Sequence, residues 1–202
     1  MGESPVPEDL AESWQVIHGY SISARPLRPS DLDIESAFVE GLSRESRYNR
    51  LLGGAINISR AYIEQLTTID YSRDMALAAV VMIGETEVLI GVARYVQEQS
   101  PDGGPGACEF AIVVADAWQG RGIGRHLMQK LIGIAGRRGL PAMFGEILAT
   151  NHGMLMMMRS LGFRIARHPE DGTVVRATLD LQASREAAAE ATHSPSTPDP
   201  AA

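Results

Sequence analysis

The sequence predicts an α/β (α+β) fold, in which a mixed, mostly antiparallel central sheet carries helices on both faces. Three observations lead to this prediction. Strand-forming residues at 110–114 run into a glycine-rich loop and then into a helical apolar pattern. Residues 75–97 form two apolar runs around a turn at 84–87, which is typical of paired antiparallel strands. Residues 142–181 read as a strand, a short helix and two more strands.

The first half of the domain follows the same patterns of apolar runs and breaks. It is predicted to contain, in order, a strand at 20–28, helices at 31–42 and 59–67, and strands at 75–83, 88–97 and 107–114. The loop 98–106 is rich in Pro and Gly, which separates the last two strands.

The second half begins with a long helix that ends near Arg138, because Ile123, Leu127 and Leu131 recur at helical spacing. After it we expect a strand at 142–148, a short helix at 152–160, and strands at 163–168 and 173–181.

Three segments are predicted along the chain. Residues 1–19 are rich in Pro and Glu and are predicted to be mobile, with at most a turn of helix near 9–14. Residues 20–182 form the folded domain. Residues 183–202 are mainly Ala, Ser, Pro and Thr, and they are predicted to be a disordered tail because they offer little apolar surface to bury.

Composition indicates a soluble globular protein: of its 202 residues, 45% are hydrophobic and 21% are charged. The net charge of −7 argues against nucleic acid as the main partner. No stretch approaches the roughly 20 apolar residues of a membrane span, and the first twelve residues lack the apolar run of a signal peptide. The single Cys108 excludes an internal disulfide, so we expect a cytoplasmic protein.

The glycine-rich loop indicates a phosphate-binding site. Gly120, Gly122 and Gly124 stand at the start of the long helix, whose first N–H groups have no partner within the helix. Without side-chain bulk, a phosphate can approach those donors closely. Arg121 and Arg125 lie four residues apart and could add charge-assisted contacts. The loop therefore predicts a diphosphate ligand.

Other glycine loops fit less well. A Walker loop would end in Gly-Lys-Ser/Thr, whereas here Gly124 is followed by Arg125 and His126. A dinucleotide-binding loop would need Gly-x-Gly-x-x-Gly within a parallel βαβ unit, and the preceding strands look antiparallel. From the glycines alone, an ordinary tight turn explains the loop equally well.

The residues around the glycines carry a resemblance to a known family. Gln119-x-x-Gly122-x-Gly124 resembles the acyl-CoA pyrophosphate loop, Gln/Arg-x-x-Gly-x-Gly/Ala, of the GNAT N-acetyltransferase superfamily. Asn151, at the start of a short helix that closes with Leu161-Gly162-Phe163, resembles the second motif of that family. The likeness covers residues 23–181.

Several short sequence segments are similar to segments in the acetyltransferase domain of bacterial protein lysine acetyltransferases. They are LRPSDLD (27–33), GLSRESRYNR (41–50), IDYSRDMALAA (69–79), CEFAIVV (108–114) and EILATNHGML (146–155). The resemblance implies a GNAT fold and acetyl-CoA as co-substrate, and it places residues 43–50 near the acceptor entrance. A solvated loop between two helices explains 43–50 equally well.

By the same resemblance, the strand before the loop parts from its neighbour, and its free backbone edge at Ile112, Val113 and Val114 pairs with the pantetheine arm. A strand that only forms part of the apolar core would have the same residues at 112–114. The full set of implied cofactor-binding residues is Ile112, Val113, Val114, Gln119, Gly120, Arg121, Gly122, Ile123, Gly124, Arg125 and Asn151.

Glu109 is the candidate general base. A free lysine has a pKa near ~10.4, so an acceptor amine needs help to lose its proton. The lysine acetyltransferases that this chain resembles use a glutamate at this point, and apolar neighbours should raise its pKa. A structural ion pair with an arginine is the alternative, and Glu146 is the reserve candidate. Cys108 should point to the opposite face of the strand, which disfavours an acyl-cysteine mechanism.

Two further positions bear on the chemistry. Many superfamily members place a tyrosine seven residues after the motif asparagine to protonate the departing thiolate, and here that position is Met158. A thiol with a pKa near ~8.5 can leave as a thiolate without this donor. The five histidines show no metal-ligand spacing, so no metal is expected.

The sequence therefore predicts an N-acetyltransferase that moves acetyl from acetyl-CoA directly to a lysine side chain of a protein partner. Neither nucleic acid nor a membrane is expected as a binding partner. Two alternatives remain open. One is acetylation of a small amine or a peptide N-terminus. The other is a catalytically weak acyl-CoA-binding module, against which Glu109 and the loop 119–124 argue because a pure binding module needs no buried base.

Overall fold

The computed structural model describes residues 5–17, 19–53, 59–100 and 102–183. Its centre is one eight-stranded sheet in the order β1-β2-β3-β4-β5-β6-β8-β7. The strands are β1 (Glu12–Ile17), β2 (Tyr20–Pro26), β3 (Met75–Ile83), β4 (Thr86–Gln99), β5 (Pro105–Val114), β6 (Ala142–Leu148), β7 (Arg164–Arg167) and β8 (Val174–Asp180). Among the strands of the described residues, only β5 and β6 pair in parallel. The predicted fold class is confirmed.

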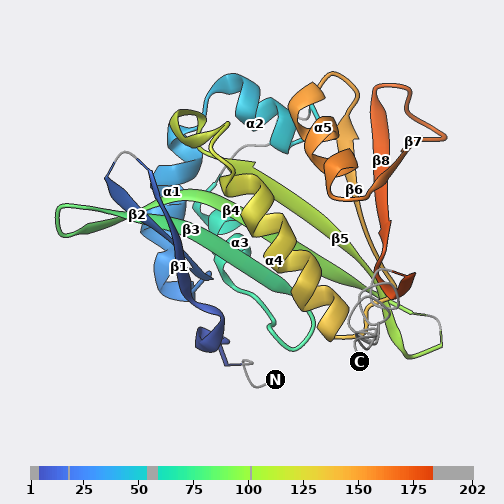
Figure 1. Ribbon diagram of the computed structural model, residues 1–202, viewed down its shortest axis with the longest axis horizontal. Helices are drawn as coiled ribbons and strands as arrows, with labels where there is room; N and C mark the ends of the chain where they lie inside the picture. Colours follow the sequence, from blue (N-terminus) through green and yellow to red (C-terminus); the bar gives the residue numbers. More distant parts are fainter. Residues whose placement is uncertain (1–4, 18, 54–58, 101, 184–202) are drawn as a thin grey trace, which may run out of the picture.

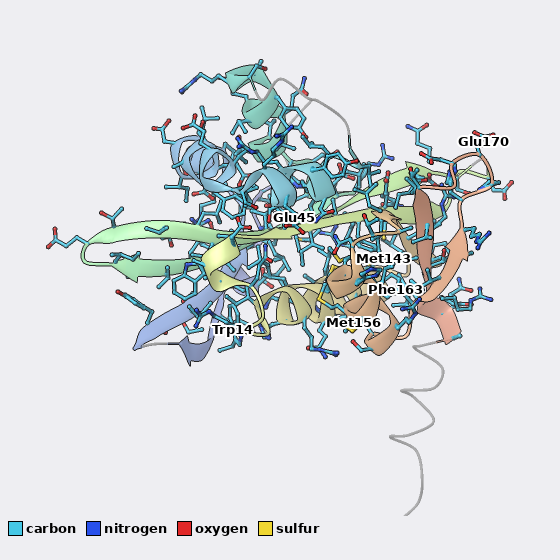
Figure 2. The ribbon with its side chains drawn as sticks, turned by 90° about the horizontal axis from the view of Figure 1, so that it is seen from above. Trp14, Glu45, Met143, Met156, Phe163 and Glu170 are labelled. Atoms are coloured by element: carbon cyan, nitrogen blue, oxygen red, sulfur yellow. The ribbon has the colours of Figure 1, made fainter. Side chains whose placement is uncertain are left out.

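Helices cover both faces of the sheet (Figures 1 and 2). On one side lie α1 (Leu32–Gly41), α2 (Arg44–Arg50) and α3 (Arg60–Thr67), and on the other lie α4 (Ile123–Arg137) and α5 (His152–Ser160). Each side has its own apolar core. Phe38 and Leu42 pack on the first face, and Leu127 and Leu131 of α4 pack on the second.

Strands β5 and β6 separate shortly after they meet. The ladder that joins them consists of Cys108 with Met143 and Glu109 with Phe144. Beyond this point, which we call the fork, β5 continues to Val114 while β6 pairs only with β8. The backbone edge of β5 that faces β6 is therefore not used by the sheet beyond Glu109.

An aromatic wedge fills the opening. The Phe110 ring is buried and packs edge-on against Phe163, with 5.3 Å between ring centroids. A Cβ on Gly145 of β6 would lie 2.6 Å from two carbons of the Phe110 ring. Glycine at 145 therefore lets the ring sit between the two strands.

Replacing Gly145 with alanine should lower the free energy of unfolding by about 1–3 kcal/mol, because a buried ring and two strands would have to shift. Denaturant unfolding with the linear extrapolation measures this change. Gly133→Ala is the matched control, since its Cβ would contact only the flexible end of Arg137 at 3.4 Å and alanine favours the α4 helix. A Gly145→Ala protein as stable as the wild type would contradict the wedge.

The N-terminal segment differs from its prediction. Residues 12–17, expected to be mobile, form β1 and pair with β2. The reason is tertiary: Trp14 stacks on His126 of α4 at 4.1 Å between ring centroids, and Glu12 contacts His126 and Lys130. A short 3-10 turn at Glu8–Leu10 precedes the strand.

Two other predictions concern residues 44–50 and the C-terminal tail at 183–202. Residues 44–50, for which a solvated loop stood as an equal alternative, form helix α2, whose N-cap Ser43 accepts a hydrogen bond from the Ser46 N–H. The predicted disordered tail lies, apart from Ala183, outside the described residues.

Candidate functional site

A cleft of about 1050 Å³ opens beside the free end of β5. We call it the main cleft. Its walls come from the end of β5, the glycine loop, the first turn of α4, the start of α5 and the inner side of α2. The predicted cofactor-binding residues that line it are Ile112, Val113, Val114, Gln119, Gly120, Gly122, Ile123, Gly124, Arg125 and Asn151. Residues of the loop and of the start of α4 thus line the same cleft as Asn151 and residues of α2, which are distant from them in the sequence.

The N-terminus of α4 is open to a ligand in this cleft. Gly122 is its N-cap at φ 85°, a left-handed conformation that favours glycine, and no side chain caps the helix. The first turn contains no acidic residue. The N–H groups of this turn therefore remain available to an anion, which the helix dipole favours. These features fit a diphosphate group.

The two arginines of the loop behave differently. Arg125 lines the cleft, and its guanidinium donates a hydrogen bond to Ser160 Oγ of α5. Arg121 is not among the cleft-lining residues. Its Nε donates to the Ala117 carbonyl, and its guanidinium lies 5.9 Å from the Trp118 ring centroid. The geometry thus favours Arg125 over Arg121 for phosphate contact.

A group of hydrogen bonds around Asp116 and Gln119, which we call the latch, joins α2 to the glycine loop. The Asp116 carboxylate accepts hydrogen bonds from the Ser43 N–H at 2.9 Å, the Ser43 hydroxyl at 2.6 Å and the Ser46 hydroxyl at 2.8 Å. Gln119 Nε2 donates to both Ser46 Oγ and the Val114 carbonyl. Burial acts to raise the pKa of Asp116, but these hydrogen bonds outweigh it and lower the pKa. Ser46 is the only buried residue of α2, so this latch is its main attachment.

Glu109 lies at the fork, on the sheet face that carries α1 and α2. It is exposed and does not line the main cleft, whose lining on β5 begins at Ile112. Partial burial and the nearby Glu146 carboxylate both raise the pKa of Glu109 above its usual value. No hydrogen bond or ion pair within 4 Å holds its carboxylate among the described residues.

Glu146, the reserve candidate, is already engaged. Its Oε1 accepts a hydrogen bond from Arg176 Nη2 at 2.8 Å and lies 3.4 Å from His168 Nε2. The Arg176 guanidinium thus already occupies the carboxylate oxygen that Glu146 would offer to an acceptor. The ion-pair alternative that the sequence left open for Glu109 thus describes Glu146.

Cys108 and Met158 both belong to the core. Cys108 is fully buried, and burial raises the pKa of its thiol to about 12. A thiol with this pKa is a poor nucleophile at neutral pH. Met158 is also fully buried, whereas its neighbour Met157 lines the main cleft. The tyrosine position of the family is therefore filled here by a core side chain.

The structure adds residues that sequence reasoning missed. Asp116 completes the latch, and Glu45, Tyr48 and Asn49 of α2 line the main cleft. The spacing of Ser43 and Ser46 before an arginine-rich run was the available signal for a capped helix. A buried ion pair, Glu35 with Arg94, gave no signal because its members lie 59 positions apart.

Two general features complete the description of the site. Within the described residues, no helix is long and apolar enough to cross a membrane. In the same part of the chain, no three His, Cys, Asp or Glu side chains are grouped so that they could hold a metal ion.

Comparison with known proteins gives matches that span most of the domain. The family model described as "Acetyltransferase (GNAT) family" matches residues 50–163. An acetyltransferase of Pseudomonas aeruginosa is 36% identical over 163 residues, which cover 81% of this chain and 86% of that protein. The GNAT domain of S. lividans PAT has a similar structure, with a TM-score of 0.75 and 28% identity over 87% of this chain and 99% of that domain.

Two further relatives have more specific names. Acetyltransferase Pat of Mycolicibacterium smegmatis is 32% identical over 169 residues, which cover 83% of this chain and 48% of that protein, so the chain spans about half of its length. An L-methionine sulfoximine/L-methionine sulfone acetyltransferase of Salmonella typhimurium is 35% identical over 98 residues, covering 48% of this chain and 57% of that enzyme.

Proposed function

Because this chain belongs to the GNAT acetyltransferase family, we propose that it transfers acetyl from acetyl-CoA directly to the side-chain amine of lysine in proteins. The chain is an acyltransferase by family. Acetyl-CoA, the lysine acceptor and the base Glu109 are the specific parts of the proposal. The observation that carries it is the position of Glu109, exposed beside the fork where β5 leaves β6.

The main cleft supports acetyl-CoA as the co-substrate. The open N-terminus of α4, with Gly122 and Gly124, would hold the diphosphate, and Arg125 would add a charge-assisted contact. The free backbone edge of β5 would hydrogen-bond the peptide-like pantetheine arm along residues 112–114. When bound, acetyl-CoA would supply an activated thioester.

In the proposed reaction, Glu109 removes a proton from the lysine ammonium, directly or through one water. The freed nitrogen forms a bond to the acetyl carbon, the carbon–sulfur bond breaks, and the sulfur leaves with the bonding electrons. The nitrogen then releases its second proton, which the departing thiolate takes up through water. Backbone N–H groups of β5 stabilise the negative charge that develops on the acetyl oxygen. The raised pKa of Glu109 makes it a better base than an ordinary surface glutamate.

The net charge of the chain supports a cationic acceptor carried on another protein. Around Glu109 itself both signs of charge are present, since in addition to burial Glu146 and Glu98 raise its pKa, and Arg176 and Arg50 lower it. The whole chain has a net charge of −7. A net negative charge favours approach of a lysine-bearing protein, and an exposed base needs no enclosed acceptor cavity. The segments that resemble bacterial protein lysine acetyltransferases point to the same acceptor.

A small amine is the second candidate acceptor. The similarity to the Salmonella typhimurium enzyme named for L-methionine sulfoximine and L-methionine sulfone supports it. Incubating the protein with labelled acetyl-CoA and either a protein extract or a mixture of amino acids separates the two candidates. Label on lysine residues of proteins supports the proposal, whereas label only on free amino acids overturns the lysine assignment.

Acetyl-CoA should raise the melting temperature of the protein, because the unfolded chain has no binding site. A ligand at about a hundred times its Kd adds ~2.7 kcal/mol to the free energy of unfolding. Thermal unfolding with and without acetyl-CoA measures this in protein freed of copurified cofactor, with adenosine as the control ligand lacking the diphosphate. Equal melting temperatures at saturating acetyl-CoA would rule out the cofactor assignment.

A further inference from the structure

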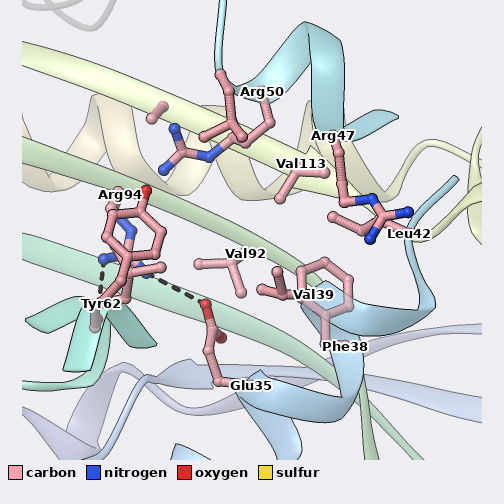
Figure 3. Close-up of a pocket in the computed structure, with 13 residues that line it drawn as sticks. Glu35, Phe38, Val39, Leu42, Arg47, Arg50, Tyr62, Val92, Arg94 and Val113 are labelled. Carbon is pink, nitrogen blue, oxygen red and sulfur yellow. Dashed lines mark hydrogen bonds and ion pairs between the residues drawn. The ribbon is translucent and has the colours of Figure 1, made fainter. Parts of the chain in front are cut away.

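A second, smaller cavity lies on the other side of β5 from α4 (Figure 3). It measures about 30 Å³, and α1, α2, α3, β4 and β5 all contribute to its lining. We call it the Glu35 pocket. Val113 and Arg50 line both this pocket and the main cleft. The two hollows therefore adjoin each other near the end of β5.

Glu35 reaches into this pocket with an unsatisfied oxygen. The residue is 2% exposed, and its Oε1 lies 3.6 Å from Arg94 Nη2, which is too long for a hydrogen bond. Its Oε2 has no hydrogen-bond partner among the described residues. Arg94 donates instead to the Leu66 carbonyl, at 2.9 Å. A buried carboxylate is costly unless it is paired and hydrogen-bonded, so this oxygen is suited to accept a bond from a ligand N–H.

Two arginines of α2 stand over the same pocket. Arg47 and Arg50 are half-buried, and their guanidinium groups have no hydrogen bond or ion pair within the described residues. In Figure 3 the Arg50 side chain extends toward Arg94 and Tyr62, while Arg47 lies near Leu42. Arg50 acts electrostatically on both Glu35 and Arg94.

The charges of the pocket do not balance. Three guanidinium groups, on Arg47, Arg50 and Arg94, face one carboxylate, on Glu35. Apolar side chains such as Phe38 and Val92 form the remaining walls. In surroundings of low dielectric, arginines without partners bind an anion strongly, and their fork matches a carboxylate. The pocket thus combines sites for a carboxylate and for an N–H donor.

We propose that the Glu35 pocket binds a carboxylate that the acceptor carries close to its reactive amine. Arg47 binds the carboxylate, Arg50 adds positive charge to the pocket, and Glu35 Oε2 accepts a hydrogen bond from an N–H of the same acceptor. This inference rests on the proposed acetyl transfer with Glu109 as base. Glu109, Ala111 and Val113 share one face of β5, so the base and the pocket wall at Ala111 are about 7 Å apart.

The carboxylate has two possible sources, a free amino acid or an acidic residue beside the lysine of a protein. Matched acceptors distinguish them. The first pair is L-lysine and L-lysinamide, and the second is a blocked lysine peptide with a neighbouring Glu or Gln. Each is titrated by calorimetry into the protein saturated with CoA, and kcat/KM is measured with acetyl-CoA.

The carboxylate form of at least one pair should bind about tenfold more tightly than its amide, as expected for a charge-assisted hydrogen bond. In Arg47→Gln this ratio should fall to near one, while the KM for acetyl-CoA stays at the wild-type value. Arg44→Gln is the matched control, because Arg44 lies on the same helix, is exposed and lines neither hollow. It should keep the tenfold ratio.

Glu35→Gln tests the second contact. It should weaken binding of both the carboxylate and the amide forms, because both carry the N–H group that Glu35 Oε2 would accept, and thermal unfolding checks that the variant is folded. The proposal is overturned if the carboxylate and amide forms bind equally in both acceptor pairs, or if no acceptor binds. It is also overturned if Arg44→Gln lowers the carboxylate-to-amide binding ratio as much as Arg47→Gln does. A loss confined to the KM for acetyl-CoA would assign the arginines to the cofactor. If instead the proposed acetyl transfer is wrong, the protein should still bind the carboxylate form more tightly than the amide but transfer no acetyl group to it.

Discussion

Replacing Glu109 with glutamine should lower kcat by about 10²–10⁴-fold and leave acetyl-CoA affinity near the wild-type value. Glutamine keeps the shape of the side chain and removes its basicity. Glu109 does not line the main cleft, so cofactor contacts should survive the change. Steady-state kinetics with a lysine-bearing acceptor, together with calorimetry for acetyl-CoA, measures the two effects separately.

The pH dependence of this variant gives a second test. Raising the pH should restore part of the lost activity, since the acceptor amine then loses its proton unaided. In the wild type, activity should fall as the pH falls through the pKa of Glu109, because the protonated carboxyl group cannot act as a base. Burial and Glu146 raise that pKa, so the fall should begin above the pH expected for an ordinary glutamate.

Glu146→Gln is the matched control, because it makes the same change one strand away. Glu146 is held by Arg176 and His168, and its loss should produce a smaller defect without recovery at high pH. Near wild-type turnover of Glu109→Gln at neutral pH would contradict the base assignment. A large defect in Glu146→Gln that high pH restores would transfer the role to Glu146.

Replacing Gly124 with aspartate should weaken acetyl-CoA binding by at least about 100-fold. A Cβ at Gly124 would lie 3.5–3.6 Å from Ile112, Met157 and Val114, which are lining residues of the main cleft. The new carboxylate would therefore stand where the diphosphate is expected, and like charges about 4 Å apart repel by several kcal/mol at a partly shielded site. Calorimetry with acetyl-CoA measures the loss.

This substitution is well suited to the test because it should not harm the fold. An acidic residue in the first turn of a helix is favoured by the helix dipole, and the contacts of the added Cβ are ordinary. Gly124→Asn has nearly the same shape without the charge, and it should lose much less affinity. Gly122→Ala is a poorer choice, since φ 85° at Gly122 strains any other residue. Unchanged affinity in a folded Gly124→Asp protein would refute the diphosphate assignment.

The central part of the site was predictable because it is local in sequence. Strand β5, the glycine loop and helix α4 are consecutive, so periodicity and glycine positions were enough to predict them. Asn151 was recognised by its resemblance to the second motif of the family. It is the N-cap of α5, and its side chain accepts a hydrogen bond from the Met154 N–H. The residues of these motifs line one cleft.

The parts that sequence reasoning missed depend on distant partners. Strand β1 is held by the stacking of Trp14 on His126, and α2 is held by Asp116. Neither segment has an apolar pattern strong enough to indicate its structure alone. Arg121 and Arg125 looked equivalent at helical spacing, but Arg121 folds back onto Ala117. Which way each arginine side chain points depends on tertiary packing, and local sequence patterns carry no information about it.

The sequence by itself determined most of the elements and the loop with Gly122 and Gly124, since these follow from short-range periodicity and backbone freedom. The family was indicated by the resemblance of two motifs. The tertiary structure decided which side chains face each other. It separated Glu109 from the cation-bound Glu146 and buried Glu35 beside Arg94 under α2. The physical reason is that burial and charge pairing depend on contacts between segments far apart in the chain. These contacts set the pKa values and the free hydrogen-bonding groups on which the proposed chemistry depends.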